Sequence, residues 1–360
     1  MMTEITHATA ELWVFPLPGP TGGSGITAVD VIVVDLEASD GTTGTGFSYV
    51  LGGGGRIVQA ATQDMLDRFV LGERILPPQA LWRRLAVSLN RLGRGVNYLA
   101  ISAIDVAMWD LHAKRLDMPL YAALGGVPRK LPVYGSGGFG PEQETGAAVD
   151  RALEYAEMGC TAIKLRVAGA PADLARIQAV ADAVPDGVGI MADANEKCDL
   201  VRAQWLVNLL ADVNALWIEE PLPANDTNGF AILAANSPIP IATGEHHQGV
   251  GEMSPLIAAR AASILQPDLA MMGGITESLR LAQIAEHFNL VVSPHFLPSL
   301  FIHVAGAAPS IKWMEDFPLL EPLFDNPVEM DAEGNIAPPD TPGHGISWVD
   351  GARDEFRSNT

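Results

Sequence analysis

Ionisable side chains recur at the ends of short apolar runs between residues 164 and 315, and their types could support metal-assisted proton transfer. Three successive runs end in a carboxylate, at Asp193, Glu219 and Glu245. Two later runs end in Asp268 and His295. Carboxylate oxygens are the ligands that Mg²⁺ prefers, and a carboxylate beside an imidazole gives a general base or acid that works near neutral pH.

Three carboxylates at one place would repel one another, and a divalent cation would relieve that repulsion. Neither cysteine follows the spacing of these acids, which disfavours zinc. A single acid after a strand more often caps the next helix. That explanation weakens when consecutive repeats all carry one, so we predict an Mg²⁺ site formed by Asp193, Glu219 and Glu245.

Further polar residues flank these groups. Lys164 and Arg166 are two residues apart in TAIKLRV, so both would point to the same side of a strand. Lys164 could bind an anion, or act as a base if its pKa fell. Arg166 suits a carboxylate or hydroxyl clamp, because its pKa exceeds about 12. Asn195 and His246 could bind substrate hydroxyls or, equally, support the neighbouring ligands.

The spacing of these groups predicts the fold. The steps from Lys164 to Asp193, Glu219, Glu245, Asp268, His295 and Glu315 are 29, 26, 26, 23, 27 and 20 residues. A buried parallel strand with its return helix and two loops needs roughly 20–30 residues, so the tandem pattern indicates a (β/α)-barrel of the TIM type. All strands of such a barrel point the same way, which would bring the strand-end residues to one mouth.

The N-terminal part predicts an α+β unit instead. Strands are expected at residues 9–15, 27–37 and 43–50, and helices at 56–70, 78–92 and 98–116. The Pro- and Gly-rich tracts near 16–25 and 51–56 are either hairpin connections or flexible flaps over the barrel mouth. Asp110 and His112, in the third helix, are expected to have structural roles.

The composition changes near residue 128, where a glycine pair ends a helix. We therefore expect a capping domain at 1–128, a barrel at 129–325 and a C-terminal segment at 326–360 that returns to the capping domain. The first and eighth barrel strands are expected at 131–136 and 310–315, with helices at 143–158, 172–184, 200–211, 227–235, 251–260 and 276–287. The tail at 344–350 is predicted to form one more strand.

Composition excludes several classes of function. The formal net charge of −21 argues against nucleic-acid binding and against attachment to anionic membranes. No apolar run reaches the roughly 20 residues of a membrane span, and the first residues lack the features of a signal peptide. We expect a soluble, cytoplasmic protein. Cys160 and Cys198 form no metal or redox motif and are expected to be reduced packing residues.

The chain resembles the enolase superfamily, in its mandelate racemase subgroup, along essentially its whole length. The resemblance implies that Asp193, Glu219 and Glu245 bind Mg²⁺, that Asp268 and His295 form a catalytic dyad, and that Glu315 hydrogen-bonds the substrate. It places Lys164 and Arg166 in a Lys-x-Lys motif, and residues 16–25 and 51–56 in loops that contact the substrate. It also implies a small carboxylate substrate and a homo-oligomer.

Arg166 departs from the family pattern, in which the second lysine is commonly a base on one face of the substrate. Racemisation needs proton transfer on both faces, whereas dehydration can use His295 alone, first as base and then as acid. We therefore predict a sugar-acid dehydratase. The alternatives are a racemase or epimerase that uses Lys164, a cycloisomerase, or a barrel that binds metal and ligand without turnover.

Overall fold

The N-terminal part of the chain is a three-stranded sheet covered by helices. The computed structural model describes residues 3–21, 25–88, 90–140 and 142–358. Strands β1 (Ile5–Thr21), β2 (Ile26–Ala38) and β3 (Thr43–Leu51) form an antiparallel sheet in that order. Helices α1 (Gly55–Phe69), α2 (Pro78–Ser88) and α3 (Val96–Arg115) pack around it. The predicted α+β unit is thus observed.

Helix α3 is the centre of this unit, because its sequence is apolar on nearly every side and most of its residues are buried. Strand β3 lies directly on its backbone at Gly46, where an added Cβ atom would be 2.1 Å from the Ala107 nitrogen. Asp110 accepts hydrogen bonds from the Thr45 nitrogen at 2.9 Å and Lys114 Nζ at 2.6 Å, which confirms its structural role. His112 packs edge-on against Trp109.

The second part is a barrel of parallel strands. These are β4 (Leu131–Gly135), β5 (Ala162–Arg166), β6 (Gly189–Asp193), β7 (Trp217–Glu219), β8 (Ile241–Thr243), β9 (Ile264–Leu265), β10 (Val291–Val292) and β11 (Met314–Asp316). Neighbours in this series pair in parallel from β4 to β10, and β11 pairs with β4. A bridge between Val292 and Ile311 completes the ring. The predicted barrel fold is confirmed.

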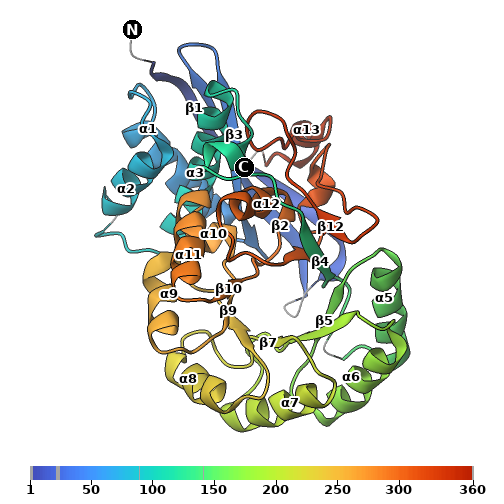
Figure 1. The fold of residues 1–360 in the computed structure, drawn as a ribbon. Coiled ribbons are helices and arrows are strands. Elements are labelled where there is room, and N and C mark those ends of the chain that lie inside the picture. Colours follow the sequence, from blue (N-terminus) through green and yellow to red (C-terminus); the bar gives the residue numbers. More distant parts are fainter. Residues whose placement is uncertain (1–2, 22–24, 89, 141, 359–360) are drawn as a thin grey trace.

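The barrel helices lie outside the strands, and α5 to α9 form a ring at the lower edge of Figure 1. They are α5 (Thr145–Glu157), α6 (Pro171–Ala183), α7 (Leu200–Asp212), α8 (Thr227–Asn236), α9 (Gly249–Ala258), α11 (Ile275–His287) and α12 (Pro298–Ala307). Shorter elements are α4 (Leu120–Ala123), α10 (Leu269–Met272), η1 (Glu321–Leu323), β12 (Asn335–Ile336) and α13 (Ala352–Phe356). Helix α12 was not predicted because it is buried and has no polar face to give a helical periodicity.

The first Pro- and Gly-rich tract is more regular than predicted. Strand β1 continues through Pro16 to Thr21, so most of the tract at 16–25 is the end of a β-hairpin. Prolines are tolerated there because β1 is the edge strand of its sheet. Residues 22–24 lie outside the described residues. In the second tract, Gly52, Gly53 and Gly54 have positive φ and connect β3 to α1.

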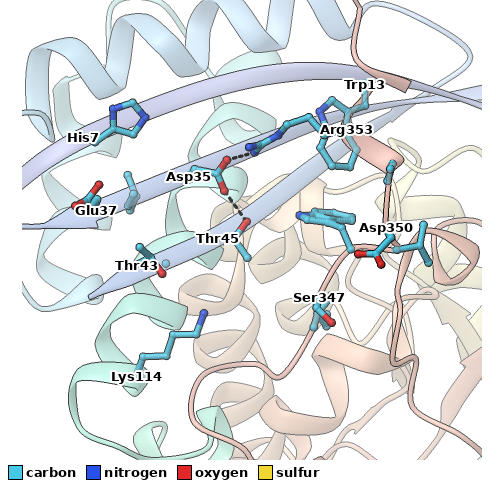
Figure 2. Close-up of a pocket in the computed structure, with 17 residues that line it drawn as sticks. His7, Trp13, Asp35, Glu37, Thr43, Thr45, Lys114, Ser347, Asp350 and Arg353 are labelled. Carbon is cyan, nitrogen blue, oxygen red and sulfur yellow. Dashed lines mark hydrogen bonds and ion pairs between the residues drawn. The ribbon is translucent and has the colours of Figure 1, made fainter. Parts of the chain in front are cut away.

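The prediction of a strand at 344–350 is wrong, although the segment does return to the capping sheet. Only Trp348 makes an isolated bridge, with Phe324, and its ring packs against Trp13 with centroids 4.9 Å apart. Packing of the Trp348 ring holds the segment together with two backbone hydrogen bonds beside the bridge, from the Asp325 nitrogen to the Ser347 oxygen at 2.9 Å and from the Val349 nitrogen to the Leu323 oxygen at 3.0 Å. Further along the chain, Arg353 pairs with Asp35 of β2, as Figure 2 shows. Both residues line a surface cavity of about 670 Å³.

The eighth barrel strand is shorter than expected and begins at Met314 rather than at residue 310. The Ser310 hydroxyl donates a hydrogen bond to the Ala282 carbonyl. Cys160 and Cys198 are unpaired and buried, as predicted. No helix in the described part of the chain is both long and apolar enough to cross a bilayer. The domain boundaries inferred from the sequence stay a prediction.

Gly46→Ala should destabilise the protein by about 1–3 kcal/mol, because the new methyl group would overlap the α3 backbone. Urea unfolding followed by circular dichroism would measure the change. Gly146→Ala is a suitable control, since it lies in α5 with nothing within 4 Å of the added atom, and its effect should be neutral or slightly stabilising. Equal stability of the two variants would contradict the close packing of β3 on α3.

Candidate active site

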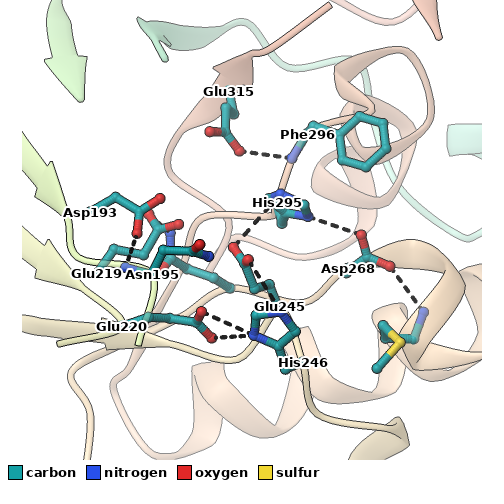
Figure 3. A network of polar contacts seen from close by, with 12 residues as sticks. Asp193, Asn195, Glu219, Glu220, Glu245, His246, Asp268, His295, Phe296 and Glu315 are labelled. Carbon is teal, nitrogen blue, oxygen red and sulfur yellow. Dashed lines mark hydrogen bonds and ion pairs between the residues drawn. The ribbon is translucent and has the colours of Figure 1, made fainter. Parts of the chain in front are cut away.

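Strand register brings the predicted site residues to one end of the barrel. Arg166 is in register with Asp193 on the next strand, and Asp193 with Glu219 on the strand after that. Asp268 and His295 form a parallel bridge directly after β9 and β10. Because parallel strands end on the same side, all of these side chains face one mouth, as Figure 3 shows for the carboxylates and His295.

Lys164 lies at the centre of the buried charges. Its Nζ is 2.7 and 2.8 Å from the two Glu219 oxygens and 2.8 Å from Glu315 Oε1, and the residue is 3% exposed. Asp193 Oδ2 is further away, at 4.0 Å. Burial lowers the pKa of Lys164, but Glu219 and Glu315 outweigh it and raise the pKa well above its ordinary value. Lys164 therefore holds a positive charge and is a poor base in this arrangement.

The mouth contains more acids than cations. Arg166 Nη1 is 2.7 Å from Asp193 Oδ2, so each cation binds one of the predicted metal ligands. Asp193, Glu219 and Glu315 contact Lys164 or Arg166, whereas Glu245 faces His295 and His246 at 3.7 and 3.8 Å. With Glu220 and Asp268, which pair with these histidines, six carboxyl groups face four basic groups. Burial together with the nearby Asp193 and Glu245 raises the pKa of Glu219 well above its ordinary value, although Lys164 acts to lower it. A divalent cation fits this oxygen donor set and would offset the repulsion among the carboxylates.

The two acidic residues beside the mouth differ in their environment. Burial raises the pKa of Glu245, but His295 and His246 outweigh it and bring the pKa down to about 2. Burial and the Glu245 charge raise the pKa of Glu220 to about 8. Near neutral pH, Glu245 is therefore ionised and suits a metal ion better than Glu220 does.

The dyad has the geometry of an oriented imidazole. His295 Nδ1 lies 2.9 Å from Asp268 Oδ2, which fixes the ring and leaves Nε2 facing the carboxylates, 3.7 Å from Glu245 Oε2. The other Asp268 oxygen accepts a hydrogen bond from the Met271 nitrogen at 3.0 Å. Burial lowers the pKa of His295, but Glu245 and the Asp268 hydrogen bond raise it to about 10. The ring must be neutral to accept a proton, and a divalent cation held by Glu245 would offset that carboxylate's effect and lower the pKa of His295.

Asn195, His246 and Glu315 lie at the same mouth with other partners. The Asn195 backbone donates to Asp193 Oδ1 at 2.7 Å, in a left-handed conformation with φ of 43°. Glu315 is held by Lys164 and accepts from the Phe296 nitrogen at 2.9 Å. His246 Nδ1 lies 3.0 Å from Glu220 Oε2, as Figure 3 shows.

A second group of possible metal ligands lies beside the predicted one. Within the described residues, the set whose ligand atoms lie within 4.8 Å of one another is Glu196, Glu220 and His246, rather than Asp193, Glu219 and Glu245. Of the predicted ligands, Glu219 contacts Lys164, Asp193 contacts Arg166, and Glu245 faces His246 and His295. His246 forms an ion pair with Glu220, whose hydrogen bond raises the pKa of the imidazole to about 9. A protonated imidazole cannot bind a metal, so the oxygen set suits Mg²⁺ better.

Sequence reasoning missed three residues that shape this site. Tyr49 of β3 donates a hydrogen bond to Asp268 Oδ2 at 2.6 Å, Gln266 donates one to Glu219, and Glu220 pairs with His246. Glu220 is adjacent to the predicted ligand Glu219, and Gln266 lies two residues before Asp268 of the dyad. That proximity was the available signal. Nothing in the sequence near Tyr49 indicates that it reaches the barrel.

A cavity of about 210 Å³ opens beside the dyad. It is lined by Asp268, His295, Glu245, His246 and by residues of β3, α3 and α10. Its volume is below the roughly 300–1,000 Å³ of cavities that hold drug-sized ligands, so it fits a small molecule. The predicted tract at 51–56 contributes Leu51 to its wall.

Comparisons with known proteins agree with this fold and site. Residues 7–125 match the family profile described as the mandelate racemase / muconate lactonizing enzyme N-terminal domain, and residues 147–352 match the enolase C-terminal domain-like profile. The chain therefore belongs to the enolase superfamily, in its mandelate racemase subgroup.

Several relatives are similar along nearly the full chain. L-talarate/galactarate dehydratase of Salmonella typhimurium is 33% identical over 91% of this chain and 83% of its own length. The 3,6-anhydro-alpha-L-galactonate cycloisomerase of Streptomyces coelicolor is 30% identical over 95% of this chain and 96% of its own. The crystal structure of L-talarate dehydratase from Polaromonas sp. JS666, complexed with Mg and L-glucarate, superimposes with a TM-score of 0.92 at 34% identity, covering 99% and 98% of the two chains.

Lys164→Met should reduce the free energy of unfolding by about 3–5 kcal/mol, because Glu219 and Glu315 would lose their buried partner. Urea denaturation at pH 7 would measure the loss. Lys130→Met removes an exposed lysine that pairs with Asp331, and it should have little effect. A Lys164 variant as stable as the Lys130 variant would contradict the charge balance described above.

Proposed function

We propose that this protein is a lyase that removes the proton α to the carboxylate of a sugar acid and then eliminates the β-hydroxyl group as water. The observation that carries the proposal is the imidazole of His295, which Asp268 orients so that Nε2 faces a buried cluster of carboxylates and cations. Dehydratases are prominent among the similar proteins.

Mg²⁺ is the cofactor in this proposal, held by Asp193, Glu219 and Glu245. When bound, the ion supplies the positive charge that stabilises the two oxygens of an enediolate. The excess of carboxyl groups over basic groups at the mouth supports this assignment, as does the magnesium in the related L-talarate dehydratase structure.

The chain's own residues supply the proton transfers and the substrate contacts. Lys164 and Arg166 attract the substrate carboxylate, and the Glu315 carboxylate accepts a hydrogen bond from a substrate hydroxyl group. His295 Nε2 takes the α-proton, and the electron pair of the broken C–H bond moves into the carboxylate. The pair then returns to form the C=C bond as the β C–O bond breaks. His295 gives its proton to the departing hydroxyl group, so water leaves and an enol remains that tautomerises to a 2-keto acid.

Asn195 and His246 are proposed to bind substrate hydroxyl groups. Asn195 follows the Asp193 ligand in the same loop, and His246 is half exposed at the cavity beside the dyad. Their hydrogen-bonding groups would fix which hydroxyl lies near His295. Assembly into a homo-oligomer and a cytoplasmic location stay predictions from the sequence.

Cycloisomerisation is the second candidate, because one relative has that activity. It would use the same proton abstraction but would leave the mass of the substrate unchanged. Racemisation fits less well, since it needs a second base and Lys164 is held as a cation by Glu219 and Glu315. Incubating the enzyme and Mg²⁺ with a panel of sugar acids in D₂O would separate the reactions. Formation of a 2-keto acid with loss of water marks dehydration, whereas no exchange and no turnover would contradict catalysis.

His295→Asn should lower kcat by at least about 10³-fold, because the only oriented base is removed. Mg²⁺ affinity, measured by isothermal titration calorimetry, should stay nearly unchanged, since the asparagine replaces no proposed ligand. His7→Asn, at an exposed histidine on the capping sheet, is the matched control. Near wild-type turnover by the His295 variant would refute the dyad assignment.

Glu245→Gln should weaken Mg²⁺ binding by at least about tenfold, because a charged oxygen ligand becomes neutral. Glu157→Gln changes an exposed acid at the end of α5 by the same chemistry and should leave affinity unaltered. Both affinities can be obtained from one series of calorimetric titrations. Unchanged affinity in the Glu245 variant would remove this residue from the ligand set.

A further inference from the structure

The wall of the cavity remote from the charged cluster is apolar. Beyond His295, the cavity is bounded by Leu51 of β3, Leu99 at the start of α3, and Ala270 and Met271 of α10. Leu51 is 39% exposed, so its side chain lies at the entrance. An apolar wall of this kind suits carbon-bound hydrogens rather than a charged group.

Neither lysine nor arginine occurs among the described residues that line the cavity. The tract at 51–55, whose Leu51 lines the cavity, contains no ionisable residue. Arg56 lines a separate cavity with Glu11, and Arg94 lies 3.9 Å from Glu252.

His246 is the one cavity residue outside the dyad that could carry a positive charge. Its Nδ1 is 3.0 Å from Glu220 Oε2, and its Nε2 is 3.8 Å from Glu245 Oε1. Both ring nitrogens thus face carboxylates of the barrel. A second substrate carboxylate would have to compete with these acids for the imidazole.

The orientation of the substrate follows from the charges. Its reacting carboxylate must lie toward Lys164 and Arg166, and the α-carbon must lie within reach of His295. The barrel interior below these groups is filled by Tyr134 and Trp217, which are buried and packed edge to face with centroids 5.6 Å apart. The rest of the substrate therefore extends past His295 into the cavity and toward its apolar wall.

We propose that the substrate is a monocarboxylic sugar acid whose far end is uncharged, and that the site rejects dicarboxylic sugar acids. This inference rests on the proposed function and specifies its substrate class. A second carboxylate would lose water against Leu51, Leu99 and Met271 without gaining a cation, and an unpaired charge in such surroundings is strongly disfavoured. An aldonic acid has a neutral hydroxymethyl group at that end, and a terminal deoxy group would fit the apolar wall still better.

The test compares aldonic acids, their terminal-deoxy analogues and aldaric acids of the same configuration, with Mg²⁺ present. We expect kcat/KM for the best monoacid to exceed that for the matching diacid by at least tenfold. A diacid that reacts as well as or better than every monoacid would overturn the inference while leaving the dehydratase proposal intact. If no acid reacts, the dehydratase proposal fails. The inference is then tested by calorimetry, and a monoacid that does not bind at least tenfold more tightly than the matching diacid would overturn it.

Leu51→Arg supplies the missing cation at the entrance of the cavity. It should raise kcat/KM for the diacid relative to the monoacid by at least tenfold, whereas Leu92→Arg, at an exposed leucine outside the cavity, should leave the ratio unchanged. Leu51→Gln, which adds polarity without charge, separates the two effects. No change in the ratio for Leu51→Arg, with the variant folded as judged by circular dichroism, would count against the inference.

Discussion

The site depends on an imbalance of buried charge at the carboxyl ends of the barrel strands. Lys164 holds Glu219 and Glu315, and Arg166 holds Asp193, yet the carboxylates still outnumber the cations. Such a cluster is costly to bury, because each charge loses its water and only part of the repulsion is offset. The proposed use of Mg²⁺ follows from that constraint, since a divalent ion would offset the repulsion among the carboxylates.

The capping domain takes part in this chemistry through one side chain. Tyr49 on β3 donates a hydrogen bond to the same Asp268 oxygen that orients His295. The dyad is therefore completed by a residue more than two hundred positions away in the sequence. Tyr49 lies on the same strand as Gly46, where β3 packs directly on the α3 backbone. The fold of the cap and the geometry of the catalytic base are thus linked.

The two sides of the mouth differ in kind. On one side, fixed cations and carboxylates favour an anionic, oxygen-rich group. On the other, residues of β3, α3 and α10 present an apolar surface next to the dyad. A substrate with a carboxylate at one end and a neutral chain at the other matches this division. In the proposed mechanism, Mg²⁺ and His295 act on the reacting carbons, and the apolar wall selects what is attached to them.

The sequence by itself determined the repeat and the identity of the main groups. Local patterns were sufficient because each barrel unit is one apolar strand followed by a helix, so spacing alone placed Asp193, Glu219 and Glu245 on successive strands. It missed α12, which is buried on all sides, and it assigned a strand to 344–350, where one isolated bridge and aromatic packing hold the chain.

Only the tertiary structure decided which groups touch. The contacts of Lys164 with Glu219, of Tyr49 with Asp268 and of His246 with Glu220 join different strands or different domains. The apolar wall beside His295 is likewise assembled from three separate segments. Periodicity specifies the direction in which a side chain points along its own strand, but distances between side chains depend on how the strands and the cap pack together, and no local pattern contains that information.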